Sequence, residues 1–98
     1  MTSSFGLATK ARALPGKQEQ LLDALGEVSR LVFNVPGCIS YVVSTLPDEP
    51  DAVFITEFWE SRQAHESIFA MAGVYEVVVQ FQALTADIEQ HELQPLAN

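Results

Sequence analysis

The segment from Ala52 to Glu60 has the pattern of a β-strand whose two faces are both apolar. Side chains alternate between the two faces of a strand, so every second residue shares a surface. The two sets are Val53, Ile55, Glu57, Trp59 on one face and Phe54, Thr56, Phe58 on the other. An antiparallel strand that meets water on one face normally carries polar residues there. This strand therefore needs a cover on each of its faces.

The segments before it alternate between strand and helix patterns. Residues 5–14 mix β-friendly residues with glycine and alanine and end at a Pro-Gly turn, which also opens a helix well. From 17 to 35 the apolar residues recur at three- and four-residue spacing, which predicts an amphipathic helix closed by a second Pro-Gly pair. Residues 38–46 form the next predicted strand, and the prolines and acids of 47–51 predict a polar hairpin connection.

The segments after it predict two helices and one more strand. Ser61 is a natural helix N-cap for a short helix over 62–70, and a longer helix follows over 74–84. The three valines at 77–79 favour a strand by their β-branching. However, the apolar residues of the whole segment fit one helical stripe better, so we predict a helix. A final strand is predicted over 87–93.

The resulting order, β-α-β-β-α-β, predicts an α+β fold of the ferredoxin-like class, with a four-stranded antiparallel sheet and the helices on one face. We expect a single domain over 1–98, with its core at about 5–94. Since the helices cover only one face, the other face meets water, a ligand or another subunit. The apolar second and third strands favour a homodimer, or a higher assembly, whose open sheet faces pack together and enclose pockets.

Composition limits the possible partners. The 5 Lys and Arg against 13 Asp and Glu give a formal net charge of -8, which repels phosphate backbones and anionic membranes. We therefore expect no nucleic-acid partner and no membrane partner. Only 18% of the residues are charged, which is low for a small monomer and favours a partner chain. The single cysteine, Cys38, fits a reducing compartment, and nothing near Met1 reads as a signal peptide, so we expect a cytoplasmic protein.

Short motifs spread along nearly the whole chain match those of a known family. They are Leu14-Pro15-Gly16-Lys17, Pro36-Gly37-Cys38 followed by Tyr41, Pro47 to Asp51, Glu57-Phe58-Trp59-Glu60-Ser61 with Ala64-His65, and Leu84 to Leu93. Each motif alone is weak, because proline-glycine turns and an E-x-W strand end are mostly structural. Together they resemble the antibiotic biosynthesis monooxygenase-like domain, within the dimeric α+β barrel group.

The resemblance implies a cofactor-independent monooxygenase that oxidises a small aromatic quinol, anthrone or phenol with dioxygen, using neither a metal nor an organic cofactor. Such chemistry needs little from the protein. An electron-rich phenolate can pass an electron to dioxygen itself once its proton is removed and water is excluded. The alternative is a non-catalytic module of the same fold that binds a small ligand or serves a stress response.

Two departures from the family's active patterns bear on this choice. The polyketide-tailoring oxygenases carry an asparagine four residues before the strand-three tryptophan, where this chain has Ile55. This departure keeps the non-catalytic module open. The haem-degrading relatives pair an asparagine on strand one with a histidine about ten residues after the tryptophan. Here strand one has no asparagine and the second position is Phe69, so haem degradation is disfavoured.

Trp59 and His65 are the predicted catalytic residues, because an indole and an imidazole lie six residues apart across a strand-to-helix corner. Trp59 offers an aromatic substrate a stacking face and an N–H donor, or else it fills the core. His65, in the first turn of a helix, is a base or a hydrogen-bond donor to an anion near neutral pH, or else a capping residue. If they form a site, both side chains reach one cavity.

Five further residues are predicted to bind the substrate. They are Tyr41, Ile55, Phe58, Phe69 and Tyr75. The Tyr41 hydroxyl suits a substrate oxygen, although core packing accounts for the same tyrosine. Phe69 and Tyr75 lie in the second helical region and are expected to line the same pocket.

Glu57 shares a strand face with Trp59, and we interpret it as an ion-pair partner of Arg12 or Arg62 in preference to a base with a raised pKa. His91 is expected to be exposed. No pair of His, Cys or carboxylate residues has metal-ligand spacing, and the sequence has no phosphate loop or nucleotide fingerprint. We therefore expect no metal and no nucleotide cofactor.

Overall fold

The computed structural model describes residues 4–96. Its strands form one antiparallel sheet in the order β2-β3-β1-β4. The elements are β1 (Phe5–Ala13), α1 (Gln18–Val32), β2 (Cys38–Leu46), β3 (Glu49–Trp59), α2 (Arg62–Glu66), the 3-10 helix η1 (Ser67–Ala70), α3 (Val74–Leu84) and β4 (Thr85–Leu93). The predicted β-α-β-β-α-β arrangement is confirmed, and the segment with three consecutive valines is helical, as its apolar stripe indicated.

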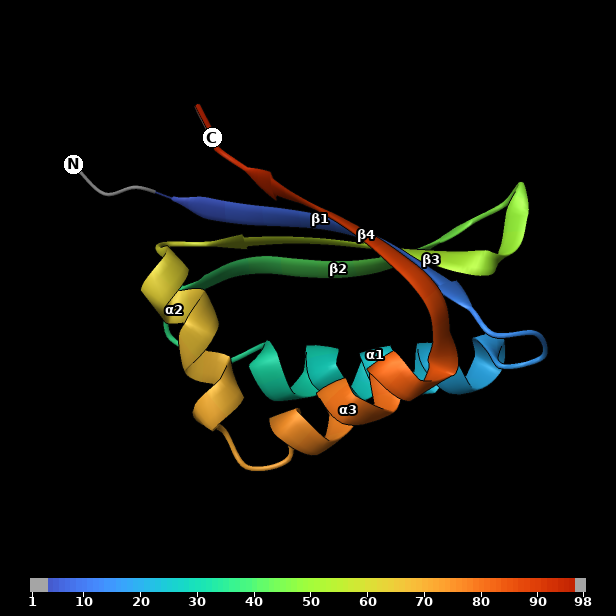
Figure 1. The fold of residues 1–98 in the computed structure, drawn as a ribbon. Coiled ribbons are helices and arrows are strands. Elements are labelled where there is room, and N and C mark those ends of the chain that lie inside the picture. Colours follow the sequence, from blue (N-terminus) through green and yellow to red (C-terminus); the bar gives the residue numbers. More distant parts are fainter. Residues whose placement is uncertain (1–3, 97–98) are drawn as a thin grey trace.

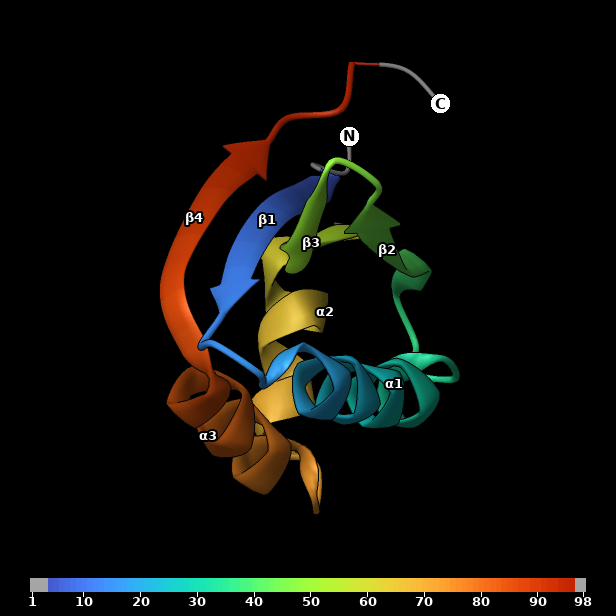
Figure 2. The same ribbon diagram turned by 90° about the vertical axis from the view of Figure 1, so that its right-hand side faces the viewer.

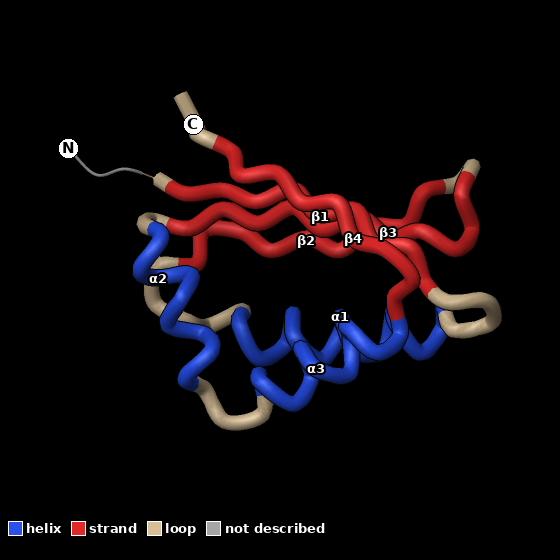
Figure 3. Tube along the Cα trace, in the orientation of Figure 1, coloured by secondary structure: helices blue, strands red, loops and turns tan. Residues whose placement is uncertain are grey.

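The helices all lie on one face of the sheet (Figure 1). α1 and α3 run side by side below the strands, and α2 connects the end of β3 to this helical layer (Figures 1 and 2). Figure 3 shows the two layers by colour, with strands above and helices below. In the part of the chain that the structure describes, the opposite face of the sheet carries no helix.

The amphipathic pattern of the first helix is confirmed by burial. The residues of α1 that pack under the sheet are Leu21, Ala24, Leu25, Val28 and Val32. The helix ends at Val32, three residues before the expected end. The reason is Pro36, which disfavours helical backbone in the residue before it and has no N–H to donate.

The connection between β2 and β3 is shorter than predicted. Only Pro47 and Asp48 separate the two strands, and β3 begins at Glu49 rather than at Ala52. The register shifts at this end of the pair, so that Leu46 pairs with Glu49 while Thr45 pairs with Val53. Such a bulge leaves residues outside the regular ladder, which accommodates a proline that cannot donate a backbone hydrogen bond.

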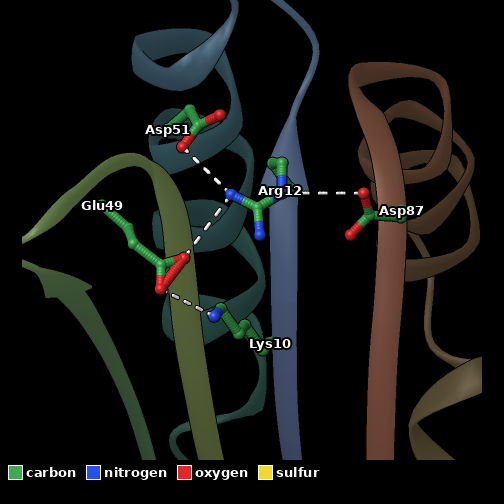
Figure 4. Close-up of polar contacts among 5 residues, drawn as sticks. All are labelled: Lys10, Arg12, Glu49, Asp51 and Asp87. Atoms are coloured by element: carbon green, nitrogen blue, oxygen red, sulfur yellow. Dashed lines mark hydrogen bonds and ion pairs between the residues drawn. The ribbon is translucent and has the colours of Figure 1, made fainter.

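Glu49 and Asp51, which were expected in a water-facing loop, lie in β3 and form ion pairs with β1 at this end of the sheet (Figure 4). Lys10 Nζ lies 2.9 Å from Glu49 Oε1, and the Arg12 guanidinium lies 3.4 Å from Asp51 and 3.6 Å from Asp87. These pairs connect β1 to both neighbouring strands. Because the side chains remain exposed to solvent, each pair contributes little to stability.

The two faces of β3 are covered differently. The set that ends in Trp59 is buried between the sheet and the helices, whereas Phe54, Thr56 and Phe58 are half-buried on the open face. Phe58 lies over Gly6 of β1, where an added Cβ would come within 2.8 Å of the phenyl ring. Glycine at position 6 therefore leaves room for the Phe58 ring on the open face.

Among residues 4–96, no single helix is long and apolar enough to cross a membrane. The segments Arg62–Ala70 and Val74–Leu84 meet the length and composition criteria only as a pair, and that pair is bent by 95° at its break.

Candidate functional site

The corner between β3 and α2 is held by local hydrogen bonds. Ser61 caps α2, and its Oγ accepts a hydrogen bond from the Ala64 N–H at 3.0 Å, as the sequence predicted. The Glu60 N–H donates to the Gly37 carbonyl at 2.8 Å. Gly37 has φ +93°, and an added Cβ would lie 2.6 Å from Ala64 Cβ, so only glycine fits here. The start of α2, and with it His65, is therefore fixed against β2.

His65 is half-buried among three aromatic rings. Its ring centroid lies 5.3 Å from that of Phe5, 5.6 Å from that of Trp59 and 5.6 Å from that of Phe69. Burial lowers the pKa of His65; the charge of Glu66 opposes this shift and that of Arg62 adds to it. A lowered pKa favours the neutral imidazole, which can accept one hydrogen bond and donate another.

Glu57 is a carboxylate in an apolar setting, only 7% exposed. The Trp59 Nε1–H donates a hydrogen bond to Glu57 Oε1 at 2.9 Å, and His65 Nε2 lies 3.6 Å from the same oxygen. Burial raises the pKa of Glu57, and the hydrogen bond from Trp59 partly offsets this shift. Burial therefore acts against charge on both Glu57 and His65, so their contact is weaker than that of an ordinary ion pair.

The predicted ion pair between Glu57 and an arginine is wrong. Arg12 projects from the open face of the sheet. It pairs with Glu49 and Asp51 of β3 and with Asp87 of β4. Arg62 pairs with Glu92 on β4 and stacks its guanidinium over the Phe5 ring at 4.6 Å. The alternation of β1 places Arg12 on the far side of the sheet from Glu57, which explains the error.

A pocket of about 300 Å³ opens between the sheet and the helices. It is lined by Leu7, Thr9, Leu25, Val28, Tyr41, Ile55, Glu57, His65, Ile68, Phe69, Val78, Phe81, Gln82, Ile88 and Gln90. The wall is mostly apolar and contains no lysine or arginine. The Gln90 amide donates to Thr9 Oγ1 at 2.9 Å and so connects β4 to β1 within this wall.

The structure brings together four of the predicted site residues. Tyr41, Ile55, His65 and Phe69 all line the pocket. Trp59 is 0% exposed and lies behind the wall, in contact with His65 and Glu57. Its side chain therefore reaches the pocket only through these two neighbours.

Two predicted residues lie elsewhere. Phe58 projects from the open face, because it alternates with the pocket-lining residues of β3. Tyr75 is 65% exposed on the outside of α3, since Val74 and Val78 occupy the inner side of that helix. Neither of them belongs to the pocket wall.

Tyr41 lies directly across from Glu57 in the β2–β3 pair. Burial raises the pKa of the Tyr41 phenol well above its usual range, and the charges of Glu57 and Cys38 add to this. Tyr41 is therefore a neutral hydroxyl that can donate or accept a hydrogen bond. His91, by contrast, is exposed on β4 and lies 2.8 Å from Glu89, as expected for a residue outside the site.

Sequence reasoning missed the contribution of β4 to the pocket. Ile88 and Gln90 face the helices only because of the register of β4 against β1. Thr9 had a weak signal, as a polar residue on the buried face of β1. No group of three His, Cys, Asp or Glu side chains within residues 4–96 is placed to hold a metal ion. The arrangement as described suits hydrogen bonding and proton transfer to a small apolar ligand.

Comparisons with known proteins agree with this fold. A solved structure from Chloroflexus aurantiacus that carries the name antibiotic biosynthesis monooxygenase is 36% identical, with a TM-score of 0.87 over 98% of this chain and 96% of that one. PA3566 from Pseudomonas aeruginosa is 21% identical, with a TM-score of 0.89 over 99% and 98%. SnoaB from Streptomyces nogalater, a cofactor-independent oxygenase, is 11% identical, with a TM-score of 0.85 over 98% and 96%.

The comparison with curated proteins found no match. The family model described as antibiotic biosynthesis monooxygenase matches residues 4–72, a segment that contains β1 to η1 and thus Tyr41, Glu57, Trp59 and His65. Together with the 36% identity to the Chloroflexus protein over almost the whole chain, this match shows that the chain belongs to the antibiotic biosynthesis monooxygenase family.

Proposed function

We propose that this protein is a cofactor-independent monooxygenase that oxidises a small aromatic quinol, anthrone or phenol with dioxygen. The observation that carries the proposal is the apolar pocket whose wall includes Tyr41, Glu57 and His65. Family membership supports it, and so does the shared fold of SnoaB, which is named as a cofactor-independent oxygenase.

The reaction is balanced without an external reductant. Loss of a proton from the substrate hydroxyl, or from the tautomeric carbon acid of an anthrone, leaves an electron-rich anion. This anion transfers one electron to dioxygen, and the two radicals combine into a carbon-bound peroxide. Cleavage of the O–O bond leaves one oxygen atom on the carbon, and the other departs as water with two hydrogens of the substrate.

The side chains of the pocket have separable tasks in this reaction. His65 donates a hydrogen bond to the substrate anion, and Tyr41 contacts a second oxygen. Phe69 and Ile55 supply apolar surface that keeps water from the reacting carbon. Because Ile55 stands where related oxygenases have asparagine, the polar contacts must come from Tyr41, Glu57 and His65 instead.

Oxygen uptake with a panel of anthrones and hydroquinones tests the proposal. We expect one dioxygen consumed per quinone formed, at a rate above that of the buffer and without added metal or flavin. The non-catalytic alternative, which Ile55 keeps open, predicts that the same compounds bind without oxygen uptake. Binding of these compounds without oxygen uptake across the panel would therefore contradict the monooxygenase and favour the non-catalytic binding module.

The proposed enzyme is a homodimer joined through the open face of the sheet. That face carries Phe54, Phe58 and Val42, the last of them 50% exposed. We expect sedimentation at about twice 10.8 kDa or higher, and Val42→Asp is expected to yield monomers because it places a charge in the contact. Val79→Asp, on α3 and 46% exposed, is the matched control and should leave the dimer intact. A parent protein that is monomeric at micromolar concentration contradicts the dimer.

The cytoplasmic location that the single cysteine favours stays a prediction. Fractionation of cells that express the protein, with an antibody as the probe, tests it directly.

A further inference from the structure

The two carboxylate oxygens of Glu57 differ in their hydrogen bonding, and only Oε1 accepts one from a described side chain. Oε1 accepts the hydrogen bond from Trp59 and faces His65. Within residues 4–96, no side chain donates a hydrogen bond to Oε2. No fully buried side-chain oxygen in this range lacks a hydrogen-bond partner, so Oε2 is not fully buried. Since Glu57 lines the pocket and Oε1 is engaged by Trp59, Oε2 is the oxygen left to accept a hydrogen bond from a ligand there.

The groups that face Glu57 leave it without a permanent positive charge. The titratable neighbours are Tyr41 and Cys38 on β2 and His65 on α2, and the shift of each pKa favours its neutral form. β1, α1, α3 and β4 contribute only uncharged residues to the same wall, of which Leu7 is the cross-strand partner of Glu57. An ionised Glu57 is therefore stabilised mainly by the Trp59 N–H.

We propose that Glu57 accepts the proton of the ligand hydroxyl in this pocket, and that Trp59 is a positioning residue that holds the carboxylate for this step. The inference rests on the proposed function and assigns its first step. The ligand O–H bond breaks, the proton moves to Glu57 Oε2, and the electron pair remains on the ligand oxygen. The site carries one negative charge before and after the step, so no second anion is created in a poorly solvated pocket.

This assignment also defines the ligand class. A ligand that arrives as an anion meets the Glu57 carboxylate in a wall without lysine or arginine. The pocket should therefore take uncharged hydroxyarenes and discriminate against carboxylated or phosphorylated ones. An already ionised phenolate can bind only if Glu57 takes up a proton.

Binding of 4-nitrophenol under anaerobic conditions tests the assignment without any turnover. Above the pKa of the probe, the affinity of the parent protein should fall about tenfold per pH unit, because each bound phenolate requires one proton taken up at the site. In Glu57→Gln this dependence should disappear, since the amide needs no proton to accommodate the phenolate. Retention of the full slope in Glu57→Gln overturns the proposal.

Two further variants separate Glu57 from its neighbours. His65→Gln should keep the slope, and loss of the slope in that variant would assign the proton to His65 instead. Glu60→Gln removes an exposed carboxylate three positions along the chain and should behave as the parent does. Because no oxygen uptake is measured, a failure of the oxygenase reaction leaves this result unaffected.

The fluorescence of Trp59 provides a second measurement on the parent protein alone. It is the only tryptophan, and its N–H contacts the titrating carboxylate, so its emission should report the ionisation of Glu57. We expect a transition above the usual carboxyl range that is absent in Glu57→Gln but present in Glu60→Gln and in His65→Gln, since the nearby His65 ring also titrates. A parent titration without this transition overturns the proposal even if Glu57→Gln fails to fold.

Discussion

Replacing His65 by alanine is expected to lower the oxygenase rate by about 10²- to 10³-fold, because it removes a donor placed to stabilise the substrate anion in a poorly solvated pocket. The loss should appear mainly in kcat, since the charge on the substrate oxygen develops after binding. His65→Gln, which retains an N–H donor, should recover part of the rate. Steady-state oxygen uptake at fixed pH measures both variants.

The stability cost of His65→Ala is expected to be small compared with its effect on the rate. The imidazole contacts the rings of Phe5, Trp59 and Phe69, and aromatic contacts contribute about 0.5–1.5 kcal/mol each. This cost exceeds that of a surface histidine but leaves a folded protein. His91→Ala, at an exposed histidine, is the control and should keep the parental rate. An unchanged rate in folded His65→Ala removes His65 from the reaction.

Replacing Trp59 by alanine is expected to have the largest effect on stability. The side chain is 0% exposed and belongs to the buried cluster beneath the sheet. Loss of a buried tryptophan costs about 3–5 kcal/mol, against a total of about 5–15 kcal/mol for a domain. We expect a strongly lowered urea midpoint of unfolding, or a chain that is already unfolded without urea. Circular dichroism as a function of urea concentration measures this. A midpoint close to that of the parent contradicts the buried placement of Trp59.

Trp59→Phe separates the volume of the side chain from its hydrogen bond. The phenyl ring keeps most of the packing, but Glu57 loses the only side-chain hydrogen bond that the described residues form with it. An unpaired buried acceptor costs about 1–3 kcal/mol. This variant should therefore remain folded while its pocket carboxylate titrates at a higher pH than that of the parent.

The sign of the pH dependence follows from the raised pKa of Glu57. The native state binds the proton more tightly than the unfolded chain, so the stability from this group is complete below the unfolded pKa and declines as pH rises through the folded pKa. Removing the Trp59 hydrogen bond raises the folded pKa further. Trp59→Phe should accordingly be more destabilising at pH values above this range than below it, as unfolding at several pH values would show.

The elements that depend on local periodicity can be predicted from the amino-acid sequence alone. The helical stripe of α1, the two faces of β3 and the Ser61 cap all follow from residues close together in the chain, and each is present in the structure. The approach of Trp59 to His65 was predictable for the same reason, because one short corner joins them. The family match was likewise carried by short motifs.

Contacts between residues far apart in the chain depend instead on strand pairing and packing, which local patterns do not predict. The partner of Glu57 is Trp59 rather than an arginine, because strand alternation places Arg12 on the opposite face. The register of β4 against β1, set by backbone pairing and a shift near Ala13, brings Gln90 into the pocket wall. Burial then changes the chemistry of the side chains. The same carboxylate would have an ordinary pKa in water, and its shift arises from the apolar layers that fold around it.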